Sequence, residues 1–458
     1  MKKTIATLCS AILASSVFAA STNTSAKENV SVKKYTVGVN SNLFAQAESS
    51  LQNTYPYGFV GGFGSALALK SYDKKTGEIS FYALTDRGPN ADGPNYTDGK
   101  TTTTSKFFLS PDFNPQIGTL TVNKKGAFIN SSIHLKNKNN SNITGLPIQP
   151  GKTGSSLETA LNADMTTLGY DNNGLDPEGL AIDNEGDFWI SDEYGPFIAK
   201  FSKSGKLIKK WSPGNGLPDI LKYRIPNRGF EGLSISPNGK VFATVQSVLD
   251  INGSEKNALF TRIIVFDPKT EKTKMYGYPV DTTVYKKSSG MKIGDVYAIN
   301  DKKLLIIEQG KNKDGNMTNV VKLVDISKAT DLTGKKINGK ELEEITDTTP
   351  LSKAVKLAKT ETIVDLRKYG WNIEKAEGLT LLPDKKTIAI VNDNDFGAGV
   401  STNTRKDITD YTYNSATKQW SLDDKATSVS VMFGNNIKSE RQNQLWLFKV
   451  NNLDNKIK

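Results

Sequence analysis

Short apolar runs separated by turn residues dominate the pattern of hydrophobic and polar positions between residues 174 and 211. Four such runs follow one another, at 180–182, 188–191, 198–201 and 207–211. The segments between them carry Gly, Asn, Asp and Ser, which reverse the chain in tight turns. The pattern therefore predicts a meander of four short antiparallel strands. One such meander cannot bury both of its faces, so it needs copies of itself.

Related modules recur along the chain. Two of them repeat the Glu-Gly-Leu sequence before an apolar run, at Glu231 and Glu377, and weaker copies begin at Gly294 and Gly64. Five modules are visible, at irregular spacing. Short strands repeated every few tens of residues are typical of a propeller or a β-solenoid, and four strands per module favour the propeller. We predict an all-β fold, a β-propeller of five or six four-stranded antiparallel blades, over residues 58–450, with a tail at 451–458.

The first 20 residues have the pattern of a secretory signal peptide. Lys2 and Lys3 precede an apolar run from Ile5 to Phe18 that ends in small residues. This run is shorter than the roughly 20 residues that span a membrane. We therefore expect a periplasmic or secreted protein whose mature chain has no transmembrane segment.

The segment at 21–57 contains a possible strand at 32–39, which would complete the last blade and leave no sheet edge free. The single cysteine, Cys9, lies in the predicted signal, so the mature chain has no disulfide and no thiolate chemistry. The single histidine, His134, falls in a predicted outer strand. These counts exclude Ser-His-Asp, Cys-His and multi-histidine metal sites.

The formal net charge of the chain is +11. Such an excess attracts anions such as phosphate esters. The lysines are scattered through turns, however, and no arginine-rich helix is present, so we expect a small anionic ester as substrate and no nucleic acid. We expect the protein to be a monomer.

The first candidate site is a ring of acids. Glu178, Glu231 and Glu377, with Asp295 in the fourth module, all precede the first strand of their modules. First strands line the channel of a propeller, so these carboxylates would meet and repel one another unless a cation neutralised them. Oxygen ligands suit a hard cation, Ca²⁺ or another divalent ion. In the alternative interpretation, each acid bonds backbone amides of the neighbouring blade.

The second candidate site follows the second strand of each module, where polar residues would crowd one mouth of the channel. The set comprises Asp86, Arg87, Asp192, Glu193, Tyr194, Gln246, Glu308, Gln309, Asn392, Asp393 and Asp395. We interpret Glu193, Glu308 and Asp192 as catalytic, and Asp86, Asn392 and Asp393 as further metal ligands. Arg87, Tyr194 and Arg228 would bind the anionic substrate, since arginine holds phosphate or carboxylate in a bidentate manner. Turn chemistry is the alternative for the Asp and Asn residues.

Five motifs in this order carry a resemblance to a known family. They are Leu-Thr-Asp-Arg-Gly-Pro at 84–89, Pro-Glu-Gly-Leu-Ala at 177–181, Trp-Ile-Ser-Asp-Glu-Tyr-Gly-Pro at 189–196, Asn-Arg-Gly-Phe-Glu-Gly-Leu at 227–233, and Glu-Gly-Leu at 377–379 with Val-Asn-Asp-Asn-Asp-Phe at 391–396. Over residues 55–450 the chain resembles the phytase-like ("esterase-like activity of phytase") family of exported bacterial proteins.

The resemblance implies a β-propeller that hydrolyses phosphoric or other esters. We therefore expect a metal-dependent hydrolase of phosphoric esters with its site at the channel mouth. A noncatalytic exported binding module and a lactonase-type carboxylic esterase are the alternatives.

Overall fold

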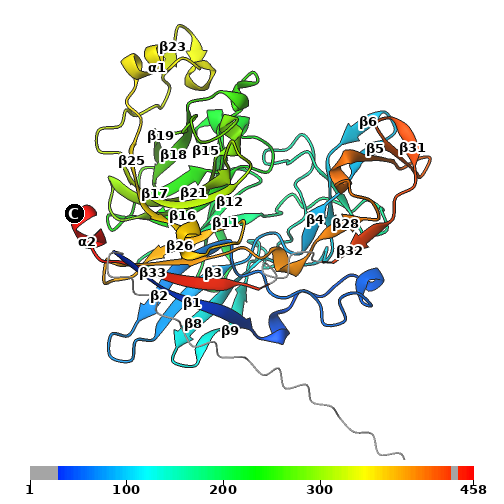
Figure 1. The fold of residues 1–458 in the computed structure, drawn as a ribbon, viewed down its shortest axis with the longest axis horizontal. Helices are drawn as coiled ribbons and strands as arrows, with labels where there is room; N and C mark the ends of the chain where they lie inside the picture. Colours follow the sequence, from blue (N-terminus) through cyan, green and yellow to red (C-terminus); the bar gives the residue numbers. More distant parts are fainter. Residues whose placement is uncertain (1–28, 435–441) are drawn as a thin grey trace, which may run out of the picture.

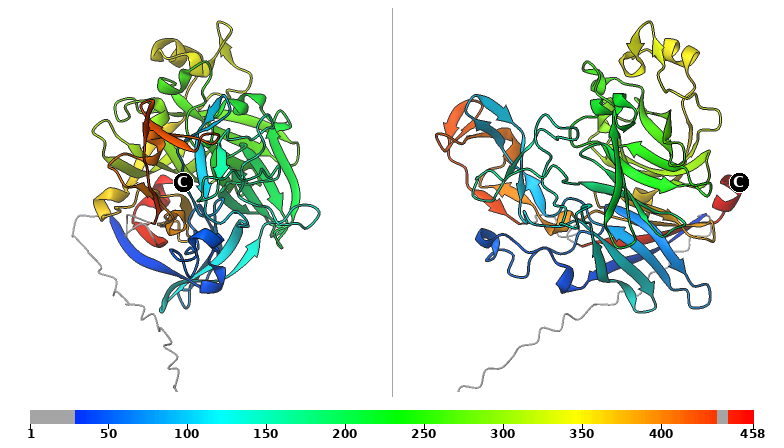
Figure 2. Two further views of the ribbon diagram at one scale, coloured as in Figure 1. Left: turned by 90° about the vertical axis from the view of Figure 1, so that its right-hand side faces the viewer. Right: turned by 180° about the vertical axis from the view of Figure 1, so that it is seen from behind.

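The computed structural model describes residues 29–434 and 442–458. Five four-stranded antiparallel blades surround a common axis (Figures 1 and 2). The innermost strands of successive blades contact one another, and the last contacts the first, which closes the ring. The predicted β-propeller is confirmed, and the blade count that the sequence left at five or six is five. The predicted signal peptide at 1–20 lies outside the described residues.

The blades follow one another along the chain, with the innermost strand given first. Blade one contains β2 (Ala66–Tyr72), β3 (Ile79–Leu84), β8 (Gln116–Asn123) and β9 (Gly126–His134). Blade two contains β11 (Pro177–Ile182), β12 (Phe188–Asp192), β13 (Phe197–Phe201) and β14 (Leu207–Pro213), extended by β15 (Gly216–Leu217). Blade three contains β16 (Phe230–Ile235), β17 (Val241–Val245), β18 (Phe260–Asp267) and β19 (Lys272–Pro279). Blade four contains β20 (Lys292–Ala298), β21 (Lys303–Lys311), β22 (Met317–Asp325) and β25 (Lys359–Asp365). Blade five contains β26 (Gly378–Leu381), β27 (Thr387–Val391), β33 (Gln444–Val450) and β1 (Val30–Val39).

The N-terminal strand β1 completes blade five. It pairs antiparallel with β33 from Val30↔Val450 to Thr36↔Gln444, and its end pairs in parallel with β9 of blade one. The strand expected at 32–39 is thus present as the outer strand of the last blade. Because β1 joins the last blade to the first, the ring is also held by backbone hydrogen bonds at its outer side.

The hydrophobic core is divided among the interfaces between blades. One cluster of buried side chains fills each of the five interfaces. Between blades two and three, for example, the indole rings of Trp189 and Trp211 stack with their centroids 5.3 Å apart. Each blade therefore buries both of its faces against its neighbours, as the meander pattern requires.

Close approach of the inner strands explains the glycine that follows each marker glutamate. A Cβ atom on Gly232 would lie 2.5 Å from the backbone nitrogen of Val296 in the next blade. We expect Gly232→Ala to lower the free energy of unfolding by about 1–3 kcal/mol, because the neighbouring strand must move. Chemical denaturation measures this. Gly169→Ala, at a position with open space around it, is the control; an equal loss in both variants would contradict the explanation.

Two insertions build a lobe that projects from the blades (Figure 1). The first follows β3 and contains β4 (Asn90–Asp92), β5 (Asn95–Asp98), β6 (Thr101–Thr103) and β7 (Ser105–Phe108). The second precedes β33 and contains β28 (Val400–Thr402), β29 (Tyr411–Asn414), β30 (Gln419–Leu422), β31 (Lys425–Thr427) and β32 (Val431–Phe433). Strand β5 pairs in parallel with β29, and β10 (Thr159–Leu161) pairs with β7. The lobe has its own apolar core.

A third insertion, before β25, contains β23 (Lys336–Ile337), β24 (Lys340–Glu341) and α1 (Thr348–Ala354). A buried ion pair between Arg262 of blade three and Glu343 fixes it to the propeller, with Nε and Oε1 2.6 Å apart. The chain ends after α2 (Leu453–Lys456). Within the described residues, no helix reaches the length and apolar character that crossing a membrane requires.

Candidate functional site

A β-bulge shapes the first strand wherever a marker glutamate lies within it. In blade two the bulge at Glu178 separates the pairs Pro177↔Asp192 and Gly179↔Ser191, and Glu231 occupies the same place in blade three. Bulges redirect side chains near functional sites. Glu178, Glu231 and Glu377 are all buried, and each offers a carboxylate oxygen within 4.8 Å of the others. Three of the four predicted ring acids therefore meet, from three different blades.

The prediction that Asp295 is the fourth acid of the ring is wrong. The bulge of blade four lies between Ile293↔Glu308 and Asp295↔Ile307, so Gly294 occupies the glutamate position. Asp295 instead has the register of the following glycine. Its Oδ1 accepts a hydrogen bond from its neighbour's amide at 2.7 Å, and its Oδ2 accepts one from the amide of Leu379 in blade five at 2.6 Å. Asp295 thus joins two blades through backbone amides, as the alternative interpretation proposed.

Register also sorts the residues that follow the second strands. Successive residues of an extended chain point to opposite faces. The pairing of each second strand with the first strand of its blade shows which residues occupy equivalent positions in the five blades. One set of equivalent residues is Asp86, Glu193, Gln246, Gln309 and Asp393. The residues one position earlier in the chain form a second set, Thr85, Asp192, Val245, Glu308 and Asn392. The first three members of the former set line a central cavity, and none of the latter set does.

Besides Asp295, four predicted site residues have the register that points away from the cavity, and their assigned roles are corrected. Both carboxylate oxygens of Asp192 accept backbone amides, from Asp176 at 2.8 Å and Gly195 at 2.7 Å. Glu308, predicted as a catalytic base, accepts hydrogen bonds from the hydroxyls of Tyr278 in blade three and Tyr285, and forms an ion pair with Lys322 in blade four.

The other two are Asn392 and Tyr194. Asn392, predicted as a metal ligand, accepts the amide of Gln444 through its side-chain oxygen at 2.6 Å. Tyr194, predicted to bind substrate, is buried and donates its hydroxyl to the carbonyl oxygen of Gly145 at 2.6 Å.

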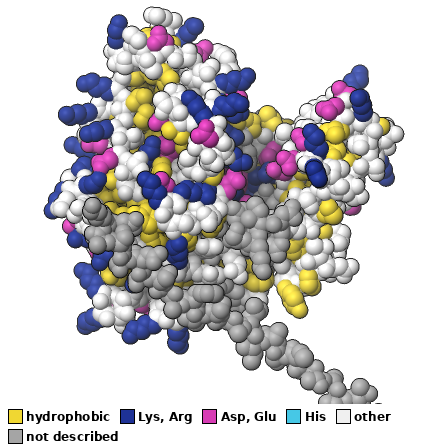
Figure 3. Space-filling view, in the orientation of Figure 1, with side chains coloured by type: hydrophobic (Ala, Val, Ile, Leu, Met, Phe, Trp, Pro, Cys, Tyr) yellow, Lys and Arg dark blue, Asp and Glu magenta, His cyan; other side chains and the backbone are white. Residues whose placement is uncertain are grey.

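The central cavity, of about 620 Å³, opens where the glutamate ring meets the lobe. Its acidic lining is Asp86, Asp92, Asp176, Glu178, Glu193, Glu231, Glu377 and Asp395, and its basic lining is Arg87, Lys106, Arg228, Lys292 and Lys375. Residues 90–92 and 398–400 contribute the wall on the lobe side. Figure 3 shows acidic and basic side chains together between the blades and the lobe. Both signs of charge therefore face the same open cavity.

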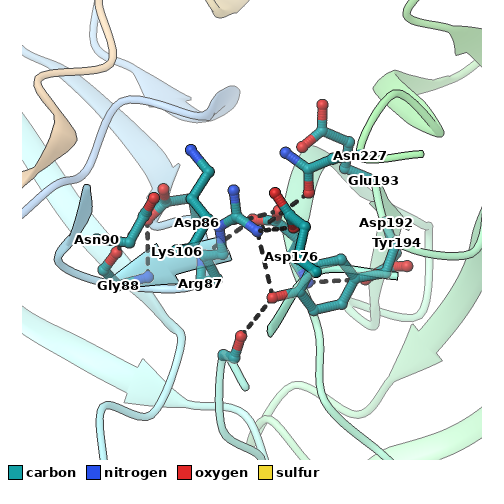
Figure 4. A network of polar contacts seen from close by, with 12 residues as sticks. Asp86, Arg87, Gly88, Asn90, Lys106, Asp176, Asp192, Glu193, Tyr194 and Asn227 are labelled. Carbon is teal, nitrogen blue, oxygen red and sulfur yellow. Dashed lines mark hydrogen bonds and ion pairs between the residues drawn. The ribbon is translucent and has the colours of Figure 1, made fainter. Parts of the chain in front are cut away.

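Asp176 is a site residue that sequence reasoning missed, although it lies two positions before Glu178. Its carboxylate lies against Arg87, with Oδ2 3.3 Å from Nε, and Arg87 also donates to Asn227 at 3.0 Å (Figure 4). Asp176, Glu178 and Asp86 bring carboxylate oxygens within 4.8 Å of one another. Arg87 is thus paired with an acid beside the ring, and it holds this part of the cavity wall in place.

The glutamate ring has the electrostatics of a cation site. Burial raises the pKa of Glu178 and of Glu231 well above the usual range, and the neighbouring acids raise both further. Burial also raises the pKa of Glu377 to about 7, although Lys375 opposes this. Clustered buried carboxylates of this kind need protons or a cation to balance them.

Buried oxygen atoms without a hydrogen-bond partner indicate whether the ring could hold a cation. Among the described residues, Oε2 of Glu178 and Oε1 of Gln246 are buried without a hydrogen-bond partner. The amide nitrogen of Gln246 donates to Glu193 at 2.8 Å and to Glu231 at 2.7 Å, which fixes both carboxylates. Three clustered carboxylates are oxygen ligands of the kind that Ca²⁺ takes, and Gln246 belongs to the same cavity lining. The residues present therefore fit a hard divalent cation.

Lys375, also missed from the sequence, acts as an internal counter-ion for another acidic group. Asp86, Asp393 and Asp395 bring oxygens within 4.8 Å of one another, and the ammonium of Lys375 lies 2.7 Å from both Asp393 and Asp395. Burial alone would lower the pKa of Lys375, but these two aspartates hold it well above its usual value.

We expect Lys375→Met to let this aspartate group take up an additional divalent ion, because the internal ammonium is gone. Metal analysis of protein dialysed against Ca²⁺ gives the number of ions per chain. Lys106→Met, which removes another lysine of the cavity, is the control. An unchanged number of ions in Lys375→Met would contradict this role of the lysine.

The chain is similar to one curated protein in sequence and to several solved structures in fold. It is 28% identical over 242 residues to a protein of Arthroderma benhamiae named "Uncharacterized secreted protein"; the match spans 43% of this chain and 46% of that relative. A luciferin-regenerating enzyme has 9% identity and a TM-score of 0.32, over 85% of this chain and 92% of that one. The virginiamycin B lyase of Staphylococcus aureus has 11% identity and a TM-score of 0.26, over 81% and 98%. The five blades of the chain themselves establish the propeller fold.

A family model described as "Phytase-like: Esterase-like activity of phytase" matches residues 59–396. The match covers the innermost strands of all five blades and the three ring glutamates. It agrees with the resemblance found in the sequence motifs. The chain belongs to the phytase-like family.

Proposed function

We propose that this protein is an exported, metal-dependent hydrolase of phosphoric esters, with its active site in the central cavity. Membership of the phytase-like family supports ester hydrolysis, and the secreted relative supports export. The observation that carries the proposal is the meeting of Glu178, Glu231 and Glu377 from three blades, with oxygens within 4.8 Å. Buried acids clustered in a cavity beside arginine and lysine side chains are typical of a functional site.

The three glutamates would hold the divalent cation, and Ca²⁺ is the ion that the all-oxygen donor set suits best. When bound, such an ion polarises a phosphoryl oxygen and lowers the pKa of its bound water. Gln246 keeps Glu231 in place through a hydrogen bond of 2.7 Å. The carboxylate of Glu231 is thereby held in place before any ligand arrives.

Arg228 and Lys292 are the side chains best placed to bind the phosphate. Both line the cavity together with the three glutamates. Arg228 uses Nη1 to donate to the carbonyl oxygen of Ser289 at 2.6 Å, which orients its guanidinium and leaves other N–H groups for an anion. Arg87, in contrast, has its guanidinium occupied by Asp176 and Asn227. Arg87 is therefore a positioning residue.

Glu193 is the general base of the proposed reaction. It is 6% exposed, lines the cavity and is oriented by Gln246. Burial raises the pKa of Glu193 well above its usual value, with Asp176 adding to the shift, so it holds a proton more firmly than an exposed glutamate would. In the reaction the ionised Glu193 accepts a proton from the attacking water, whose oxygen forms a new bond to phosphorus as the ester P–O bond breaks. The proton then passes from Glu193 to the leaving alkoxide, which departs as the alcohol and leaves Glu193 ionised again.

A substrate panel tests the proposal. The mature protein is assayed with an aryl phosphate, an aryl carboxylate ester and a lactone, each in Ca²⁺ and in excess EDTA. We expect hydrolysis of the aryl phosphate in Ca²⁺ and its loss in EDTA. Hydrolysis of the lactone alone would replace the proposal with a carboxylic esterase. Inertness toward all three by protein shown to hold its metal would replace it with a noncatalytic binding module.

A further inference from the structure

A second pocket, of about 780 Å³, lies beside the central cavity between blades three and four. Its walls come from η4 (Ser254–Lys256), from η5 (Ser288–Gly290) and from the facing ends of β21 and β22. Seven basic residues line it against two acidic ones, Glu374 and Glu377. The basic residues are Arg228, Lys256, Lys286, Lys287, Lys292, Lys311 and Lys375. We refer to it as the basic pocket.

Among the described residues, most of these basic side chains have no acidic side chain in direct contact. Lys375 is paired with Asp393 and Asp395. In the part of the chain that the structure describes, the other six basic residues form no ion pair. Several unpaired cations facing one concave surface produce a positive potential that concentrates anions.

The pocket is a built structure and not a chance gathering of surface lysines. A Cβ on Gly310 would lie 2.2 Å from the carbonyl oxygen of Gly290, so two of the walls meet backbone to backbone. Ser289 is 1% exposed, and its hydroxyl has no hydrogen-bond partner among the described residues. An unpartnered hydroxyl among cations is a ready donor for an anionic oxygen.

The basic pocket is continuous with the proposed active site. Arg228, Lys292, Lys375 and Glu377 line both the pocket and the central cavity. Glu377 is itself one of the three ring glutamates. The basic pocket therefore lies directly beside the position of an ester held over the glutamates.

We propose that the basic pocket is a subsite for a second anionic group on the substrate. The inference rests on the proposed function for the first group, the phosphoric ester over the glutamates. The preferred substrate is then a phosphoric ester whose alcohol part carries a further anionic oxyacid group, a phosphate or a carboxylate. Lys256, Lys286 and Lys287 are exposed at the pocket and bind that group, while Arg228 and Lys292 lie between the two subsites.

Binding of inert probes tests this subsite without requiring turnover. Calorimetry compares propylphosphonate, which has one anionic group, with phosphonopropanoate and propanediphosphonate, which have two. In Ca²⁺ we expect the probes with two groups to bind roughly tenfold more tightly, since several exposed ion pairs add small increments. The better of these two probes identifies the second group as carboxylate or phosphate.

The triple variant Lys256→Gln, Lys286→Gln, Lys287→Gln should lose this gain and bind propylphosphonate as before. The control, Lys74→Gln, Lys75→Gln, Lys125→Gln, removes three exposed lysines from hairpins of blade one and should keep the gain. Equal binding of all probes, or a gain that survives in the pocket variant, overturns the inference. If the gain follows the pocket lysines while no phosphate ester is hydrolysed, the subsite stands and the proposed reaction fails.

Discussion

Glu193→Gln is expected to lower kcat for an aryl phosphate roughly 100- to 10,000-fold, the range that removal of a general base typically produces. Glu193 lines the cavity beside the glutamate ring and is fixed there by Gln246. An amide has the same shape but cannot accept the proton. Thermal unfolding should be nearly unchanged or improved, because burial disfavours the charged form of Glu193.

Steady-state kinetics and a melting curve on the same sample check this result. Glu185→Gln is the matched control: it removes one negative charge from an exposed group of acids around Lys200, far from the cavity lining. Its kcat should be that of the unsubstituted protein. A Glu193→Gln enzyme with full activity would remove the base from the proposed mechanism.

Chelation is expected to abolish hydrolysis and to destabilise the fold in a pH-dependent manner. Burial raises the pKa of Glu377 to about 7 from an ordinary value of 4.5. A carboxyl group whose pKa is raised by folding stabilises the protein when protonated, and this contribution is lost as the pH rises from about 4.5 through about 7. Without a cation the protein should therefore be less stable at pH 8 than at pH 5.5, with the ring acids repelling one another.

Ca²⁺ should reverse this loss at pH 8. At a concentration 100 times its dissociation constant, an ion that binds only the folded state adds about 2.7 kcal/mol to the stability. The rise in Tm should be much smaller at pH 5.5, where protons compete for the same oxygens. Calorimetric melting at both pH values, with Ca²⁺ or with EDTA, measures the difference, and Glu231→Gln should weaken the response. Equal Tm values in Ca²⁺ and EDTA at pH 8 would contradict a cation site in the ring.

The repeat pattern was enough to predict the fold. Short strands, turn glycines and recurrent Glu-Gly-Leu sequences indicated the blades, and the N-terminal strand was found where closure requires it. The glutamates of three modules could be grouped because equivalent positions of a circular repeat share one axis. Residue type alone, however, gave Asp295 a place in the ring that the bulge of blade four assigns to Gly294.

Side-chain direction was the information that the sequence pattern lacked. Glu193 and Glu308 are both acids near the end of a second strand, but they differ by one position in register and so face opposite sides. Asp176 and Lys375 were missed because each belongs to a connection before an inner strand, where no periodicity marks it. Aligning the modules by their bulges, and not by residue type, would have separated these cases.

The lobe and the basic pocket depend on contacts between distant segments. The parallel pairing of β5 with β29 joins residues more than 300 positions apart, and the pocket combines loops of blades three and four. Neither arrangement has a local sequence signature. The lobe and the basic pocket both border the central cavity, so the loops inserted between strands also shape the site.

Anomalous diffraction from crystals grown with Mn²⁺ in place of Ca²⁺ tests the central claim most directly. We predict a peak among the carboxylates of Glu178, Glu231 and Glu377, and its loss in Glu231→Gln crystals grown in the same way. A map with no peak among these three carboxylates, from crystals of protein that hydrolyses the aryl phosphate, would contradict the account.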